Sequence, residues 1–211
     1  PAGYSCYNNE IVPIPCSLGT YSNGNSQNCT ACPPGYSCQV DDNTLTPCNV
    51  GTYSNMNEMN CTTCSAGYYC TAGAYSATPT DGITGNICSS GSYCPAGTDS
   101  PVLCPAGTYS TQEGNDELSD CIDCPGGYSC PLEGMSVTTE ICPAGFYCPQ
   151  GTSEPTLECT AGNYCPEGSD EEVPCEPGTY QNLNTKGSCN ICPAGYFCPG
   201  NGNNDYVDNI C

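Results

Sequence analysis

The sequence contains no histidine, tryptophan or arginine, and Lys186 is its one basic side chain. The absence of histidine removes the side chain that most often serves as a general acid or base, and no Gly-x-Ser-x-Gly motif is present. Against the single cation stand 22 Asp and Glu residues, which give a net charge of −21. A surface without cations cannot neutralise phosphate groups. We therefore expect no enzymatic activity, no nucleic-acid partner and no membrane contact by this segment.

Long apolar runs are also missing. No stretch of about 18 apolar residues predicts a membrane span, and no basic stretch followed by an apolar one marks a signal peptide. Only 2 Phe and 3 Met are present, and 24 of the hydrophobic residues are cysteines. A conventional aliphatic core cannot be built from this supply, so covalent links must offset the entropy cost of folding, about 1 to 2 kcal/mol per residue.

Cysteine is the residue in excess, with 24 in 211 positions, which is typical of a disulfide scaffold. Disulfides persist in oxidising compartments, so we expect an extracellular or cell-surface protein. Four Cys-x-x-Cys pairs also suggest half of a zinc site or a thioredoxin-like redox pair. Zinc binding by the four pairs would leave 16 cysteines unexplained, and the pairs lie between turns rather than in the βαβ setting of a redox enzyme.

The acidic residues are interpreted as a solvated surface, and a calcium-binding array is the alternative. No cofactor is expected otherwise. None of the acidic groups has the alternating oxygen-ligand spacing of an EF-hand loop. The best calcium candidates are Asp41 with Asp42, Asp116 to Asp120, and Asp170 to Glu172.

The sequence contains an internal repeat. Residues 1–32 align with residues 33–64 without a gap, so that Cys6, Cys16, Cys29 and Cys32 recur as Cys38, Cys48, Cys61 and Cys64. Such a period is typical of an array rather than a single globule. We divide the chain into repeat 1 (1–32), repeat 2 (33–64), extended repeat 3 (65–124), extended repeat 4 (125–192) and partial repeat 5 (193–211).

Each repeat is built from smaller modules: a Gly, an aromatic residue one or two positions on, a middle cysteine and a closing cysteine. The Gly allows a tight turn beside a disulfide, and the aromatic side chain is expected to cover that disulfide. Short modules place the middle cysteine three residues after the Gly, whereas long modules have Gly-Thr-Tyr, a polar loop and then Cys-x-x-Cys. Two-residue alternations, such as Gly-Thr-Tyr-Ser and Ser136 to Thr139, predict brief strands and hairpins.

Loop length suggests which cysteines pair. In long modules the preceding cysteine would bond the first cysteine of Cys-x-x-Cys, and in short modules it would bond the middle one. The pairs are Cys16 with Cys29, Cys48 with Cys61, Cys104 with Cys121, Cys175 with Cys189, Cys32 with Cys38, Cys64 with Cys70, Cys88 with Cys94, Cys124 with Cys130, Cys142 with Cys148, Cys159 with Cys165, and Cys192 with Cys198.

Cys6 and Cys211 are left over and are expected to pair outside the segment. A rival scheme bonds middle with closing cysteines and forces small Cys-x-x-Cys rings, and mixed schemes also remain open, because sequence alone does not fix connectivity. The predicted fold class is small disulfide-rich repeats, an elongated rod of short β-hairpins and irregular loops with little or no helix.

Two N-glycosylation sequons occur at equivalent places in the first two repeats. They are Asn28-Cys29-Thr30 and Asn60-Cys61-Thr62. Recurrence in register favours their use over a chance match, so N-linked glycans are expected at Asn28 and Asn60.

The strings CPAGTYS to CPGGYSC (104–130) and CNVGTYS to CTTCSAGYYC (48–70) resemble the cysteine-rich ephrin-receptor-like repeat, which is similar in style to tumour-necrosis-factor-receptor and EGF-like modules. This resemblance implies an extracellular, disulfide-bonded, elongated array. Tandem arrays of this repeat are found in surface proteins of protists and algae, including proteins similar to mastigonemes, and in animal receptor ectodomains.

The first functional hypothesis is therefore an extracellular structural protein, a segment of a glycosylated filament or surface coat that is mastigoneme-like. Its expected partners are further copies of the same array, through self-association, and other extracellular proteins. The alternative is a ligand-binding or adhesive ectodomain of a cell-surface receptor.

Overall fold

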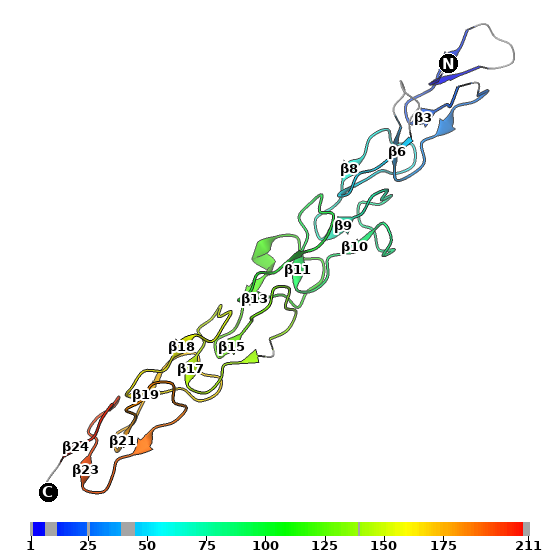
Figure 1. The fold of residues 1–211 in the computed structure, drawn as a ribbon. Helices are drawn as coiled ribbons and strands as arrows, with labels where there is room; N and C mark the ends of the chain where they lie inside the picture. The colour runs from blue at the N-terminus through cyan, green and yellow to red at the C-terminus, as the bar shows by residue number, and fades with distance from the viewer. Residues whose placement is uncertain (1, 7–11, 25, 39–44, 139, 209–211) are drawn as a thin grey trace. The chain divides into compact units, whose positions relative to one another are not determined.

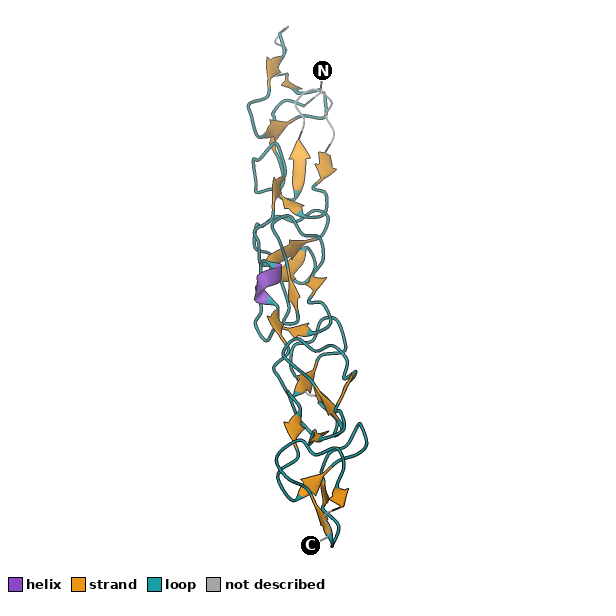
Figure 2. Ribbon diagram, turned by 90° about the vertical axis from the view of Figure 1, so that its left-hand side faces the viewer, coloured by secondary structure: helices purple, strands orange, loops and turns teal. Residues whose placement is uncertain are grey.

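The computed structural model describes residues 2–6, 12–24, 26–38, 45–138 and 140–208. Its strands are two or three residues long and pair into twelve two-stranded sheets, each made of strands consecutive in the chain (Figure 1). Loops and turns form most of the remaining chain, and one short 3-10 turn, η1 (Leu118–Asp120), interrupts them (Figure 2).

The strands in the N-terminal half are β1 (Tyr4–Ser5), β2 (Ile14–Pro15), β3 (Thr20–Tyr21), β4 (Thr30–Ala31), β5 (Tyr36–Cys38), β6 (Leu45–Pro47), β7 (Thr52–Tyr53), β8 (Thr62–Thr63), β9 (Tyr68–Cys70), β10 (Gly85–Ile87), β11 (Ser92–Tyr93) and β12 (Val102–Leu103). Those in the C-terminal half are β13 (Thr108–Tyr109), β14 (Ile122–Asp123), β15 (Tyr128–Ser129), β16 (Glu140–Ile141), β17 (Phe146–Tyr147), β18 (Leu157–Glu158), β19 (Asn163–Tyr164), β20 (Val173–Pro174), β21 (Thr179–Tyr180), β22 (Asn190–Ile191), β23 (Tyr196–Phe197) and β24 (Val207–Asp208).

The β13–β14 hairpin shows why these residues form these elements. The Thr108 N–H donates to the Pro105 carbonyl at 3.1 Å, and Gly107 has φ +89° at the third position of this turn. A turn of this kind needs a positive φ at its third position, which glycine takes without strain. The chain then extends for two residues, and Tyr109 pairs with Ile122 in antiparallel register. Aromatic and β-branched residues suit this pairing.

The buried core consists of half-cystines. Apart from Ala74 and Pro79, every buried hydrophobic side chain among the described residues is a cysteine. The module tyrosines are not part of this buried core. None of them is fully buried, and Tyr4, Tyr36 and Tyr196 are exposed. Tyr53 is the one that packs on a core cluster, formed by Cys64, Cys70 and Ala74. The missing aliphatic core is therefore replaced mainly by sulfur.

The chain forms two compact units, residues 1–102 with 112–120 and residues 103–111 with 121–211. In each unit successive hairpins follow one another in chain order. Every hairpin also lies inside one of the five repeats drawn from the sequence. Within the described residues no helix is long and apolar enough to cross a bilayer.

The prediction of short strands is confirmed for the three Gly-Thr-Tyr-Ser segments, residues 19–22, 51–54 and 107–110, each of which contributes a Thr-Tyr strand. The predicted strand at Ser136 to Thr139 is wrong. Residues 136 and 137 form a bend, and β16 begins only at Glu140. The reason is that Gly127 sets the register: its carbonyl accepts the Cys142 N–H, which places the two residues before Cys142 opposite β15.

Candidate functional site

The structure contains eleven disulfides, and they join the eleven pairs that the loop-length rule gives. Their Cα–Cα distances run from 5.6 to 6.4 Å, within the usual range for disulfides. The two cysteines of each Cys-x-x-Cys pair belong to different disulfides. Each first cysteine closes a long loop, and each second cysteine opens the next short ring.

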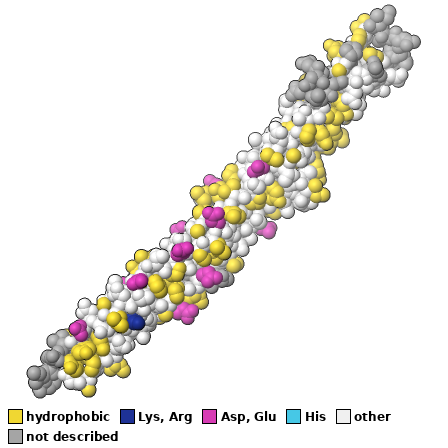
Figure 3. All heavy atoms as spheres, viewed as in Figure 1, with side chains coloured by type: hydrophobic (Ala, Val, Ile, Leu, Met, Phe, Trp, Pro, Cys, Tyr) yellow, Lys and Arg dark blue, Asp and Glu magenta, His cyan; other side chains and the backbone are white. Residues whose placement is uncertain are grey.

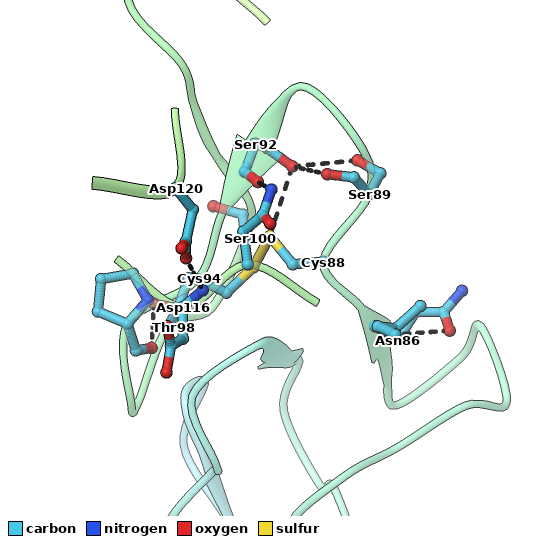
Figure 4. Close-up of a disulfide and its surroundings, with 12 residues drawn as sticks. Asn86, Cys88, Ser89, Ser92, Cys94, Thr98, Ser100, Asp116 and Asp120 are labelled. Atoms are coloured by element: carbon cyan, nitrogen blue, oxygen red, sulfur yellow. Dashed lines mark hydrogen bonds between the residues drawn. A yellow bond between two sulfur atoms is a disulfide. The ribbon is translucent and has the colours of Figure 1, made fainter. Parts of the chain in front are cut away.

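The Cys88–Cys94 disulfide illustrates a short ring (Figure 4). Both half-cystines are fully buried. The buried Ser92 hydroxyl lies beside Cys88 Sγ at 3.4 Å and donates to the Ser89 carbonyl at 2.6 Å. The Ser92 carbonyl in turn accepts the side-chain amide of Asn115 at 3.0 Å. The polar groups next to this disulfide are therefore satisfied without water.

Long hairpins have no cysteine three residues after the module glycine, where short hairpins have their middle cysteine. Ser22, Ser54, Ser110 and Gln181 occupy that position and are buried. The Ser54 hydroxyl donates to the Tyr36 carbonyl of the preceding hairpin at 2.9 Å, and the Ser22 hydroxyl makes the same bond to Tyr4 at 2.7 Å. In these two long hairpins a hydrogen bond from the serine side chain to the backbone of the preceding hairpin thus stands where a short hairpin has its disulfide.

Within each of the two units, backbone hydrogen bonds connect successive hairpins of the described chain. The module glycine donates its N–H to the carbonyl of the residue that lies three positions after the next module glycine. For example, Gly127 donates to the Cys148 carbonyl at 2.9 Å. The Cys130 N–H then reaches into the next hairpin and donates to the Thr152 carbonyl at 2.9 Å. The same glycine bond is made by Gly3, Gly35, Gly51, Gly67, Gly107, Gly145, Gly162 and Gly178.

A second contact connects each hairpin to the one two positions further along. Its key residue, called here the docking residue, has a positive φ and donates its N–H to the carbonyl of the cysteine that closes the hairpin two positions earlier. Nine such bonds occur, at 2.8 to 3.0 Å. The docking residues are Asn57, Gly73, Gly97, Gly114, Gly134, Gly151, Gly168, Thr185 and Gly202, and they bond Cys32, Cys48, Cys64, Cys88, Cys104, Cys124, Cys142, Cys159 and Cys175 in that order.

For every docking residue except Gly134, the structure places the carbonyl against the module glycine of that same earlier hairpin. A Cβ added to Gly107 would come within 2.6 Å of the Gly151 carbonyl oxygen, and one added to Gly145 would be equally close to that of Thr185. No Cβ fits there, so these positions require glycine for space as well as for φ. A hairpin that makes both contacts is therefore held by the next two hairpins.

The sequence interpretation identified the module glycines but missed the docking residues. The available signal was a second glycine three or four residues after the middle cysteine, as in Cys94 to Gly97 and Cys130 to Gly134. Variable spacing hides it in long hairpins, where Asn57 and Thr185 hold the position with φ +68° and +60°.

The acidic residues do not form a metal site in the described part of the chain. No group of three or more Cys, Asp or Glu side chains there is placed to hold an ion. On the face seen in Figure 3 the acidic side chains lie apart from one another. Asp120 accepts the backbone N–H groups of Glu117 and Asp116, which lower its pKa. Asp41 and Asp42 lie outside the described residues.

Asp81 organises the loop of the β9–β10 hairpin. Its carboxylate accepts the N–H groups of Ile83 and Thr84 at 2.8 and 2.7 Å and the hydroxyls of Thr84 and Tyr75 at 2.7 and 2.8 Å. The Thr84 hydroxyl and these other donors hold the pKa of Asp81 well below its usual range. The ionised form is therefore the one that orders the loop.

This loop is predicted to lose its order in acid. A carboxyl whose pKa is lowered by folding contributes stability above its unfolded pKa of about 4, and that contribution disappears as the pH falls through the lower folded-state pKa. The amide chemical shifts of Ile83 and Thr84 should therefore change only well below about pH 4, where Asp81 in the folded chain takes up its proton. In Asp81→Asn this transition should be absent. A transition that persists in the variant would assign it to another group.

The remaining predicted site residues are placed as follows. Asn28 and Asn60 are exposed, just before β4 and β8, and the cysteine inside each sequon is disulfide-bonded. Cys6 is a free, partly exposed thiol in the single chain. Cys211 lies outside the described residues. Pairing of these two cysteines outside the segment stays a prediction.

A shallow hollow of 240 Å³ is lined by Tyr164, Glu176, Thr179 and Cys189. Typical small-molecule sites enclose about 300 to 1,000 Å³ and surround most of the ligand. Neither the volume nor this lining resembles such a site.

Comparison with known protein families gives no match, and comparison with curated proteins gives none either. The chain is a cysteine-rich array of small disulfide-bonded β-hairpin repeats. Its eleven disulfides indicate an oxidising environment, secreted or extracellular.

Proposed function

We propose that the chain is an extracellular structural protein, a segment of a glycosylated filament or surface coat at the cell surface. The observation that carries this proposal is the docking contact, which recurs nine times with the same backbone atoms. An interaction made by backbone groups and glycines repeats independently of the other side chains. It therefore favours a scaffold, whose elements are held to their neighbours, over a protein built around one specialised site.

The chemistry of the hairpins supports a load-bearing role. Every disulfide closes a local loop, with sequence separations from 6 to 17 residues. A pulling force cannot extend the chain enclosed by these loops while the bonds are intact. Extension is then limited to the residues between the loops and to the backbone hydrogen bonds between hairpins.

The receptor alternative has less support. A protein ligand needs an interface of at least about 1,000 Å² with anchors such as Tyr, Trp or Arg. Tryptophan and arginine are absent, and the exposed apolar side chains are distributed over many hairpins.

The glycan prediction can be tested by mass. Expressed in a glycosylating secretory host, the protein should carry N-linked sugar at Asn28 and Asn60, since both side chains are exposed. Asn28→Gln should remove one glycan, and the double variant with Asn60→Gln should have the mass of the bare polypeptide. Thr30→Ala and Thr62→Ala, which keep both asparagines, should give the same masses. A wild-type protein that already has the bare mass would contradict this prediction.

The proposed function is tested by locating the protein on the cells that make it. Antibodies applied to intact cells and viewed by electron microscopy should label filaments or a continuous coat. Label found only after permeabilisation would contradict an extracellular role. Label confined to the plasma membrane, with no coat or filament, would favour the receptor alternative.

A further inference from the structure

The disulfides of the long hairpins differ from those of the short rings in the exposure of their sulfur atoms. In the six short rings from Cys32–Cys38 to Cys159–Cys165 both half-cystines are buried. Each long-loop disulfide instead joins a buried half-cystine to a partly exposed one. The partly exposed members are Cys29, Cys61, Cys121 and Cys189. A thiol in solution can therefore reach the long-loop disulfides more easily than these six rings.

The surroundings of Cys189 leave room for an attacking thiol. Cys189 lines the hollow of 240 Å³ together with Tyr164, Glu176 and Thr179, whereas its partner Cys175 is fully buried. Thiol–disulfide exchange requires the attacking sulfur to approach the target sulfur on the side opposite the sulfur that leaves. With the leaving sulfur inside the hairpin, that approach comes from the solvent.

Two of the long-loop disulfides enclose a docking residue in an unusual conformation. The Cys48–Cys61 loop contains Asn57, and the Cys175–Cys189 loop contains Thr185. Among the described residues, only these two combine a positive φ with a side chain. Every docking residue that lies outside the disulfide loops is a glycine. The side chains at positive φ thus occur where a disulfide closes the chain around them.

A side chain at positive φ is strained, mildly for Asn and more strongly for a β-branched residue such as Thr. Such a conformation persists only where its surroundings impose it. The closed loop restricts the conformations available to Thr185, and the Thr185 N–H donates to the Cys159 carbonyl at 2.8 Å. The Cys175–Cys189 disulfide therefore helps to hold a strained residue in its docked position.

We propose that a dithiol selectively reduces the Cys48–Cys61 and Cys175–Cys189 disulfides and thereby releases the docking contacts of Asn57 and Thr185. Each reduction removes one of the contacts that hold the hairpin two positions earlier, while the buried short rings stay oxidised. The chain is then a disulfide scaffold with redox-sensitive joints. This inference goes beyond the proposed function and does not depend on it, because it concerns bonds within the chain.

The exchange proceeds in two steps. A thiolate of the dithiol attacks the Cys189 Sγ, a mixed disulfide forms, and the Cys175 sulfur leaves and takes up a proton. The second thiolate of the dithiol then attacks the sulfur bound to Cys189, so that Cys189 leaves and is protonated in turn. The dithiol loses two electrons and two protons and becomes a disulfide, and the two cysteines gain them as thiols. The same steps apply to Cys61 and Cys48.

Limited reduction of the oxidised 211-residue chain tests the selectivity. The protein is exposed to dithiothreitol, a neutral dithiol, for increasing times, and its new thiols are alkylated and located by peptide mass spectrometry. Cys61 and Cys189 should become alkylated at least about tenfold faster than the half-cystines of the Cys64–Cys70 and Cys142–Cys148 rings, whose sulfur atoms are buried. Equal rates for the long loops and these rings would overturn the proposal.

Hydrogen exchange tests whether the docking contact depends on the bond. Cys175→Ser combined with Cys189→Ser keeps the shape of the half-cystines without the link. The Thr185 amide should lose protection by roughly tenfold or more in this variant. The Gly168 amide, which donates to the Cys142 carbonyl at 2.8 Å and lies outside the loops, should keep its protection. Cys124→Ser combined with Cys130→Ser, the matched control, removes a short ring of the same unit and should leave Thr185 protected.

Thr185→Gly separates strain from general loosening. Added to the Cys175→Ser, Cys189→Ser variant, it should restore part of the protection of the amide at position 185, because glycine takes a positive φ without strain. Unchanged protection of Thr185 in the serine variant would overturn the proposal. So would equal loss at Thr185 and Gly168, which would mean that the whole unit unfolds, or the absence of any recovery with Thr185→Gly.

Discussion

Reduction of the disulfides should unfold the chain completely under conditions in which the oxidised protein stays folded. The buried core is made of half-cystines, and the strands are only two or three residues long. Isolated two-stranded hairpins are marginal in water. Loss of one native disulfide from a small secreted domain typically costs about 2 to 5 kcal/mol, whereas a domain's whole stability is about 5 to 15 kcal/mol. Losing all of the disulfides should therefore cost more than the whole free energy of unfolding.

The measurement is the dispersion of backbone amide signals by NMR before and after a strong thiol-free reductant. Wild-type protein should show dispersed amides that collapse on reduction. Alkylation without reductant, which modifies free thiols such as Cys6, should leave the spectrum dispersed. A chelator should also leave it dispersed. A reduced chain that keeps its dispersed amides would show that something other than disulfides holds the fold.

Gly107→Ala should destabilise the hairpins around it far more than Gly178→Ala. The two glycines have φ of +89° and +85°, so the cost of placing alanine at positive φ, about 1 to 2 kcal/mol, is shared by both variants. They differ in their surroundings. The new methyl group at Gly107 meets the Gly151 carbonyl, whereas the one at Gly178 meets open space. Forcing a group into such a packed position costs about 1 to 3 kcal/mol more.

Hydrogen exchange at the Gly151 amide reports on this contact directly. In the native chain this N–H donates to the Cys124 carbonyl at 2.8 Å. Gly107→Ala should reduce its protection by roughly tenfold or more, because the docking residue must move away. Gly178→Ala should leave it unchanged. Equal protection in the two variants would mean that the close approach of the docking residue does not contribute to stability.

The fold class and the cysteine pairs follow from local features of the sequence. A closing cysteine, a turn glycine and a middle cysteine lie within a few residues of one another, and a short chain segment has few ways to join them. The Thr-Tyr strands follow from the same local pattern, since the Gly before them sets the turn and the register. The strand expected near Ser136 does not form there because alternation does not fix the register, which the Gly127 carbonyl sets through its bond to Cys142.

The contacts between hairpins could not be predicted in this way. Gly107 and Gly151 are far apart in the sequence, and a loop of variable length precedes each docking residue. Thr185 does not resemble a glycine at all, although it takes the same conformation. No local sequence pattern indicates that a turn will be buried against the hairpin two positions earlier in the chain.

The central claim is that local disulfides of defined pairing, with no Cys-x-x-Cys ring, hold a chain of interlocked hairpins. Disulfide mapping of the non-reduced protein by mass spectrometry tests it most directly, with acid cleavage because Lys186 is the one site for trypsin. The account predicts that Cys121 is linked to Cys104 and that Cys124 is linked to Cys130. A bond between Cys121 and Cys124, or these cysteines recovered as free thiols, would contradict it.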